Sequence, residues 1–135
     1  MTIIIPLLLS SIAAVESGGN AHAVGKAGEL SAYQISPAVW KQHAKPDEPH
    51  ALASTNAELA AHIAEKHIIA LMRQLEAAGV PVTVETLADA WHSGAHGAIN
   101  RRLKTATPTD YSARVRNLYD EAVAKQPSNV PEHLK

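Results

Sequence analysis

Apolar residues in this chain recur mostly at three- and four-residue steps, the spacing that places them along one face of a helix. The longest such row lies between Asn56 and Gly79. Its inward positions are Ala60, Ile63, Ala64, His67, Ile68, Leu71, Met72 and Leu75. No stretch alternates between apolar and polar residues over the length of a strand, and no internal repeat or low-complexity block stands out. The pattern therefore predicts an all-α domain of about six helices.

Proline and small polar residues mark where the predicted helices begin. Ser36 and Pro37 form an N-cap followed by a proline at the first helical position, which opens a short helix. Residues 45–53 contain two prolines and are expected to form a surface loop. The remaining helix starts are expected at Asn56, Thr83 and Pro108-Thr109.

The N-terminal segment is strongly apolar. Its run from Ile3 to Leu9 resembles the core of a signal peptide, but no Lys or Arg precedes it. The run continues without a linker into Glu16, and it is shorter than the roughly 20 residues that a membrane span needs. We therefore expect a buried first helix with Pro6 in its opening turn, rather than a cleaved signal or a membrane span.

This first helix delivers a carboxylate to an abrupt helix end. Gly18 and Gly19 follow Glu16, and adjacent glycines end helices because they readily adopt left-handed backbone conformations. In a last helical turn, the macrodipole and apolar neighbours both favour a protonated carboxyl, so the pKa of Glu16 should be raised. General acid catalysis on a glycosidic oxygen requires such a group. Farther on, Tyr33 and Gln34 carry a phenol and an amide suited to hydrogen-bonding a sugar.

Composition limits the other classes of function. The chain has 135 residues and a formal net charge of −1, so nothing marks it as a nucleic-acid binder. Cysteine is absent, which excludes a disulfide framework and thiolate chemistry. The length fits one domain, which we assign to residues 1–125, followed by a C-terminal tail over residues 126–135.

Eight histidines raise the question of a metal centre. His92 and His96 are four residues apart, a spacing that places two imidazoles on one face of a helix. Gly94 and Gly97, however, argue against a regular helix there, and no third ligand is evident. We therefore expect no specific metal site.

The residues around Glu16, taken together, resemble a known family. They are similar to the pattern E-S-x-x-N, then A-V, then G-x-x-G-L-M-Q-I-x-P, which opens the lysozyme-like fold of soluble lytic transglycosylases and goose-type lysozymes. The matching residues here are Glu16, Ser17, Asn20, Ala23, Val24, Gly28, Gln34, Ile35 and Pro37. The resemblance implies that Glu16 is the catalytic acid and that Gln34 lines a saccharide groove. We expect Tyr33 and Ser17 to contribute beside them, Ser17 mainly at the helix end.

The resemblance continues into the C-terminal half. Residues 91–97 (WHSGAHG) stand where the family has Y-N-A-G-P-G, which implies that Trp91 and His92 lie near the groove. The last predicted helix is similar to the family's closing Y-V-x-x-V-x-x-L-Y helix, whose first tyrosine, here Tyr111, faces the groove. This chain departs from the family pattern at Ser31, His92 and Ala95.

The resemblance implies cleavage of the β-1,4 bond between N-acetylmuramic acid and N-acetylglucosamine in peptidoglycan strands. A lytic transglycosylase forms a 1,6-anhydro product and needs a single carboxylate, here Glu16, and no cofactor. Hydrolysis usually needs two carboxylates. No other Asp or Glu has a spacing in the sequence that marks it as the partner of Glu16, although Glu29 is the nearest candidate. We therefore favour the transglycosylase over a hydrolase. The departures leave open a third reading, an inactive glycan-binding module.

The expected partners follow from this reading. Glycan strands of peptidoglycan are the expected ligand, and we expect the protein to act as a monomer. The substrate lies outside the cytoplasm, yet the sequence carries no secure signal peptide, so localisation stays open between the periplasm, the exterior and a phage particle.

Overall fold

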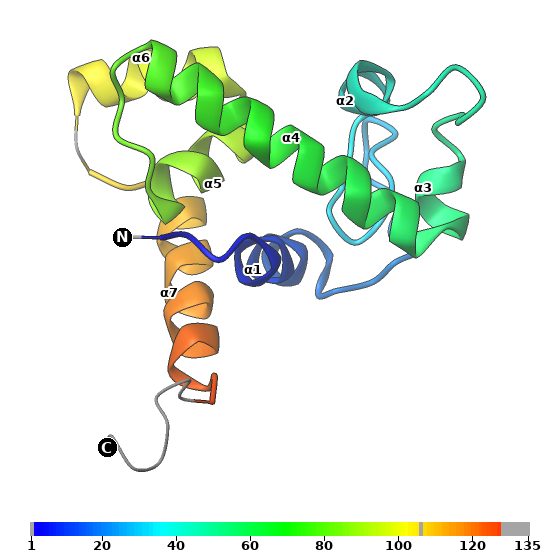
Figure 1. The fold of residues 1–135 in the computed structure, drawn as a ribbon, viewed down its shortest axis with the longest axis horizontal. Coiled ribbons are helices and arrows are strands. Elements are labelled where there is room, and N and C mark those ends of the chain that lie inside the picture. Colours follow the sequence, from blue (N-terminus) through cyan, green and yellow to red (C-terminus); the bar gives the residue numbers. More distant parts are fainter. Residues whose placement is uncertain (1, 106, 128–135) are drawn as a thin grey trace.

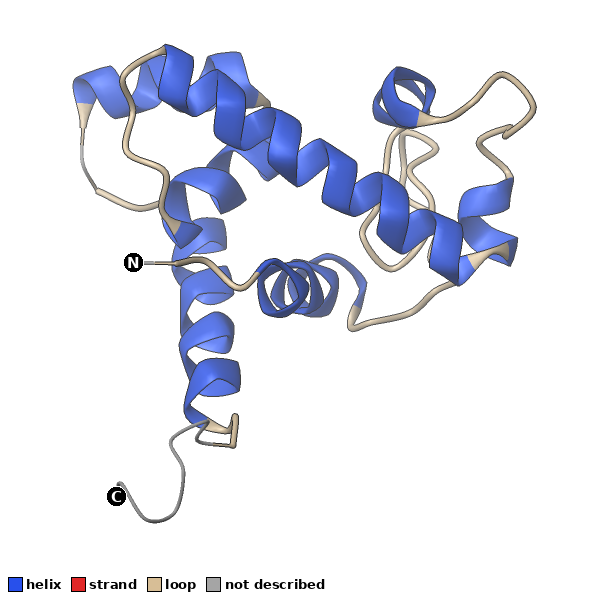
Figure 2. Cartoon of the chain, in the orientation of Figure 1, coloured by secondary structure: helices blue, strands red, loops and turns tan. Residues whose placement is uncertain are grey.

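The structure, a computed structural model, describes residues 2–105 and 107–127, and within these ranges it has seven helices and no strand. The helices are α1 (Ile5–Ser17), α2 (Pro37–His43), α3 (Leu52–Thr55), α4 (Ala57–Ala77), α5 (Val84–Ser93), α6 (Ala95–Lys104) and α7 (Asp110–Ala124), as Figures 1 and 2 show. The prediction of an all-α domain is confirmed. Residues 128–135, which make up most of the predicted tail, lie outside the described residues.

The predicted helix starts are confirmed. In four helices an N-cap side chain accepts a hydrogen bond from a backbone N–H of the first turn, a contact worth about 1 kcal/mol in each case. These caps are Ser36 for α2, Asn56 for α4, Thr83 for α5 and Thr109 for α7. Pro6 and Pro37 lie in the opening turns of α1 and α2, where the missing N–H costs no hydrogen bond.

Two helices differ from the sequence-based expectation. The predicted surface loop over residues 45–53 ends in α3, a helix of 4 residues that the proline-containing pattern does not indicate. The expectation that Gly94 and Gly97 exclude a regular helix is wrong for Gly97. Gly94 does separate α5 from α6, with a φ of 80°, but Gly97 lies within α6. One glycine costs a helix only about 1 kcal/mol, which the other residues of α6 offset.

Helix α4 is the element against which most of the fold packs. It crosses the molecule in Figure 1 and contacts α1, α2, α3, α5 and α6. Six positions of its predicted inward row are at most 2% exposed: Ala60, Ile63, Ala64, Ile68, Leu71 and Leu75. Leu8 and Ile12 from α1 are fully buried in the same core, which confirms the buried first helix. In the part of the chain that the structure describes, no helix is long and apolar enough to cross a membrane.

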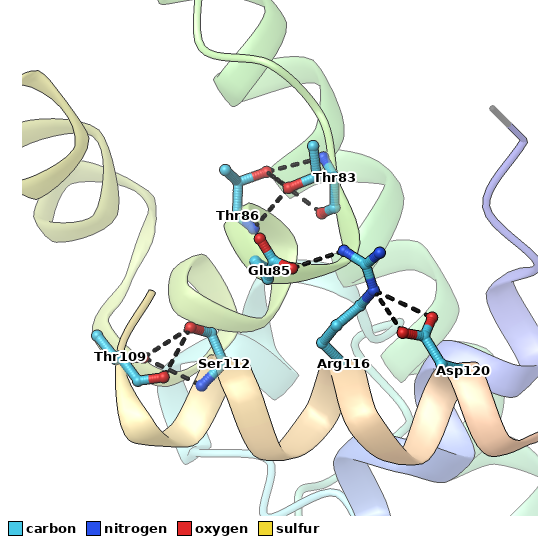
Figure 3. A network of polar contacts seen from close by, with 7 residues as sticks. All are labelled: Thr83, Glu85, Thr86, Thr109, Ser112, Arg116 and Asp120. Atoms are coloured by element: carbon cyan, nitrogen blue, oxygen red, sulfur yellow. Dashed lines mark hydrogen bonds and ion pairs between the residues drawn. The ribbon is translucent and has the colours of Figure 1, made fainter. Parts of the chain in front are cut away.

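Polar contacts stabilise α5 and α7, and one ion pair joins the two helices (Figure 3). Arg116 on α7 donates from Nη1 to Glu85 Oε1 at 2.6 Å and from Nε to the two carboxylate oxygens of Asp120 at 2.9 and 3.0 Å. Figure 3 also draws the capping pairs at the starts of the two helices, Thr83 with Thr86 and Thr109 with Ser112. The contacts help to hold the two helices that carry the predicted site residues His92 and Tyr111.

Candidate active site

Glu16 lies in the last turn of α1, as the sequence predicts. The helix ends because Gly18 and Gly19 adopt φ values of 65° and 82°, in the left-handed region that glycine tolerates. Their backbone N–H groups donate to the carbonyl oxygens of Ala14 and Ala13 at 3.0 and 3.1 Å, which satisfies part of the helix terminus. Glu16 is half-buried and lies one residue before the end of the helix.

A cleft of about 300 Å³ opens beside Glu16. It is formed by the end of α1, the loop between α1 and α2, and the sides of α2, α4 and α5. Its lining residues are Glu16, Glu29, Gln34, Ile35, Ser36, Val39, His67, Trp91 and His92. Four of the predicted site residues therefore meet at one place, and the volume is at the lower end of the range for small-ligand pockets.

The surroundings of Glu16 favour its protonated form. Burial raises the pKa of Glu16 above its ordinary value, because a half-buried carboxylate loses part of its hydration. His92 opposes this shift and lowers the pKa of Glu16, while the negative charge of Glu29 raises it. The net direction is upward, which agrees with the expectation from the sequence and suits a general acid.

Tyr111 lies behind His92 rather than in the lining of the cleft. The two rings stack with their centroids 4.2 Å apart and their planes at 17°. The Tyr111 hydroxyl is buried and has no hydrogen-bond partner among the described residues. Burial raises the pKa of Tyr111 above its ordinary value of 10.0, and the charge of Glu16 raises it further, so the phenol stays protonated. A hydroxyl donor without a partner therefore lies within electrostatic reach of the Glu16 carboxyl.

The loop between α1 and α2 depends on two non-glycine residues with positive φ. Ser31 has a φ of 77°, so it takes the left-handed conformation although the family pattern has a glycine there. Gln34 has a φ of 55°, and its Nε2 donates to the carbonyl oxygens of Ser31 at 2.8 Å and Ala23 at 3.1 Å. The side-chain nitrogen of Gln34 is therefore used within the loop, whereas its Oε1 makes no hydrogen bond with a described residue.

Gly25 allows two cleft-lining side chains to approach the loop backbone. A Cβ at this position would lie 2.6 Å from Oε1 of Gln34 and 2.6 Å from Oε1 of Glu29, closer than atoms tolerate. The same Glu29 oxygen accepts the backbone N–H of Ala27 at 2.8 Å. The sequence pattern gave no reason to single out Gly25, because the contact depends on how the loop folds back on itself.

Besides Tyr111, two predicted substrate-binding residues lie outside the cleft lining. Ser17 Oγ lies 2.7 Å from the carbonyl oxygen of Ala32 and accepts the backbone N–H of Asn20 at 3.1 Å, so it ties the helix end to the loop. Tyr33 lines a separate hollow between α1 and α4, which also contains Pro6 and His62. Tyr33 and Gln34 are neighbours in the loop, yet they line different hollows.

The histidines do not form a metal centre within the described ranges. No group of three or more His, Cys, Asp or Glu side chains is placed there to hold an ion. His92 belongs to α5 and His96 to α6, on the two sides of Gly94, so they do not share a helix face.

The all-α domain places a partly desolvated glutamate at a helix end, in a cleft that an amide and aromatic rings also line. This arrangement is typical of a lysozyme-like protein. The chain belongs to the family of the transglycosylase SLT domain, whose family model matches residues 3–114. The matched range includes every residue that lines the cleft, as well as Ser17, Tyr33 and Tyr111. No curated protein and no solved structure gives a significant match. Membership implies a peptidoglycan substrate and enzymatic cleavage of the transglycosylase type.

Proposed function

We propose that this protein is a peptidoglycan lytic transglycosylase in which Glu16 acts first as the acid and then as the base. The observation that carries the proposal is the half-buried Glu16 carboxyl, with its raised pKa, at the wall of a cleft that Gln34, Trp91 and His92 also line. A carboxyl that is protonated before substrate binds has a proton to donate to the glycosidic oxygen.

The reaction then needs no second carboxylate. Glu16 protonates the oxygen between N-acetylmuramic acid and N-acetylglucosamine, and the bond from that oxygen to the anomeric carbon breaks. The 6-hydroxyl of the same muramic acid attacks the anomeric carbon, and its proton passes to the ionised Glu16. No water is consumed, the product has a 1,6-anhydro ring, and Glu16 returns to its protonated state.

Tyr111 and His92 have the positions of supporting groups. The Tyr111 hydroxyl has no partner in the free protein, and we assign it to donate a hydrogen bond to the Glu16 carboxylate when the latter loses its proton. His92 holds the Tyr111 ring by stacking and faces the cleft, where it can contact sugar. Trp91 offers an aromatic face, and Gln34 Oε1 an acceptor, for sugar groups.

Hydrolysis is the second candidate, because Glu29 lines the same cleft and its charge reaches Glu16. In a hydrolase Glu29 would activate water. Its Oε1, however, accepts the backbone N–H of Ala27 at 2.8 Å, so this oxygen is already engaged with the loop. We therefore assign Glu29 to tuning Glu16.

The test is the release of soluble fragments from purified sacculi by four forms of the protein. Glu16→Gln should lower the rate by about 10²- to 10⁴-fold, the usual contribution of a general acid. Glu29→Gln should change it by only a few-fold, and Glu121→Gln, an exposed residue on α7, serves as the matched control. Equal losses for Glu16 and Glu29 would support hydrolysis, whereas binding of the wild type without release would support a non-catalytic module.

A further inference from the structure

His67 lines the cleft, although its spacing in the sequence predicts a position in the core. It belongs to the inward row of α4, among residues that are fully buried, yet it is only half-buried and lines the cleft. Its neighbours along the row, Ala64 and Ile68, are closed off from solvent. The cleft therefore exposes one position of the row, and that position carries an imidazole.

The His67 ring is held from two sides. On the side of α5 it packs edge-to-face against Trp91, with the centroids 5.4 Å apart and the planes at 65°. On the side of α2 it packs against His43 at 5.1 Å and 63°. His43 Nε2 also lies 2.9 Å from His67 Nδ1, a hydrogen-bonding distance. Two ring contacts and one hydrogen bond fix the orientation of this side chain in the free protein.

One ring nitrogen of His67 is left for a ligand. Nδ1 is used by His43, whereas Nε2 makes no hydrogen bond with any described residue and is not one of the buried unpartnered atoms, so it reaches solvent. The His67 side chain lines the cleft, so a ligand bound in the cleft meets this ring.

The pair of histidines is uncharged near neutral pH. Burial and the neighbouring His43 lower the pKa of His67 to about 4, and burial together with Lys66 lowers the pKa of His43. In a hydrogen bond between two neutral imidazoles one ring donates and the other accepts, so the tautomer of His43 decides which nitrogen of His67 carries its proton. An uncharged imidazole is suited to an uncharged polar group rather than to a carboxylate.

We propose that His67 is a sugar-binding residue, whose Nε2 hydrogen-bonds a hydroxyl or the N-acetyl amide of the glycan, and that His43 is a positioning residue that fixes the orientation and tautomer of His67. This proposal rests on the proposed function, because it takes the ligand of the cleft to be a glycan. His43 does not line the cleft, so its whole effect on binding passes through His67.

The test measures binding of the N-acetylglucosamine tetramer by calorimetry to the Glu16→Gln protein, which binds without cleaving. His67→Phe keeps an aromatic ring against Trp91 and removes both nitrogens, and it should weaken binding about five- to tenfold, the loss of one hydrogen bond. His67→Gln, which returns an amide nitrogen near the place of Nε2, should restore binding to within about threefold. His62→Phe, an exposed histidine of the same helix outside the cleft, is the matched control.

A double-mutant cycle tests the role of His43. His43→Phe should weaken binding when His67 is present and have no effect in the His67→Phe protein, because the two changes act on the same contact. Imidazole ¹⁵N NMR gives a second readout that needs no substitution at His67: the tetramer should shift the His67 Nε2 resonance and leave that of His62 in place. This measurement decides the matter if His67→Phe does not fold.

The inference is overturned if folded His67→Phe binds the tetramer as tightly as its parent, or if the tetramer does not shift the His67 Nε2 resonance. It is also overturned if the Glu16→Gln parent binds no tetramer. Failure of the proposed function looks different. In that case the wild type releases no fragments from sacculi, even where the tetramer binds and moves the His67 signal.

Discussion

Replacing Tyr111 with phenylalanine should make the free protein more stable and the enzyme slower. The change removes only the hydroxyl, which is buried without a hydrogen-bond partner among the described residues, and it keeps the ring that stacks on His92. Burying an uncompensated hydroxyl costs about 1–3 kcal/mol on the scale of protein mutations. The free energy of unfolding should therefore rise by about 1–2 kcal/mol, which is a rise in Tm of roughly 3–10 °C for a domain of this size.

The same substitution should lower kcat. If the hydroxyl donates to Glu16 after the proton leaves, its removal takes away a hydrogen bond to a charged group, worth about 1.5–3 kcal/mol. That loss corresponds to a fall in kcat of roughly 10- to 150-fold. Urea unfolding measures the first effect, and fragment release from sacculi measures the second.

Tyr119→Phe is the matched control, because Tyr119 lies on the same helix and its hydroxyl does have a partner. It accepts the backbone N–H of Ile4 at 2.9 Å, and removing it leaves that N–H unpaired. This variant should lose about 1–3 kcal/mol of stability and keep its activity. A Tyr111→Phe protein that is destabilised like Tyr119→Phe, or that is stabilised at full activity, would refute the reasoning about Tyr111.

Three further predictions concern the helix end and the loop. Ser31→Gly should unfold within about 1 kcal/mol of the wild type in urea, whereas Ser31→Val should lose about 2 kcal/mol or more, since a β-branched residue tolerates a φ of 77° poorly; equal stabilities would contradict this. Gly25→Ala should fold but raise KM for glycan, because its Cβ displaces Oε1 of Gln34 as well as that of Glu29. An unaltered KM would show that Gln34 does not bind substrate. Glu16→Gln should have a higher Tm than the wild type at pH 7 and the same Tm below about pH 4.5. The reason is that the pKa of Glu16 is raised in the folded state, so the wild type loses stability as the pH rises through that pKa. A difference in Tm that grows toward low pH would show that the pKa is lowered instead.

The parts of the fold that the sequence predicts are those set by local chemistry. The N-caps, the inward row of α4 and the glycine-ended α1 each depend on residues within one or two turns of one another. Helices α3 and α6 are different, because a helix of 4 residues has too short a pattern to recognise, and Gly97 is tolerated by packing that the sequence does not display. Ser31 likewise adopts the conformation of the glycine it replaces because the surrounding loop holds it there.

The site residues likewise divide into those that the sequence motifs predict and those that only the folded structure places. Glu16, Gln34, Trp91 and His92 meet at one cleft, as the motif residues indicate. Tyr33 does not line it, because neighbours in a turn point in different directions and the sequence does not say which faces the cleft. His67 is the reverse case: its spacing assigns it to the core, and only the arrangement of three helices around it leaves one edge of its ring accessible.

We propose that one protonated glutamate, Glu16, completes the reaction without water. Mass spectrometry of the fragments released from purified peptidoglycan tests it most directly, because a 1,6-anhydro end is lighter than a reducing end by one water. We expect anhydro ends from the wild type and from Glu29→Gln, and release slowed by about 10²- to 10⁴-fold from Glu16→Gln. Reducing ends from the wild type, or undiminished release by Glu16→Gln, would contradict it.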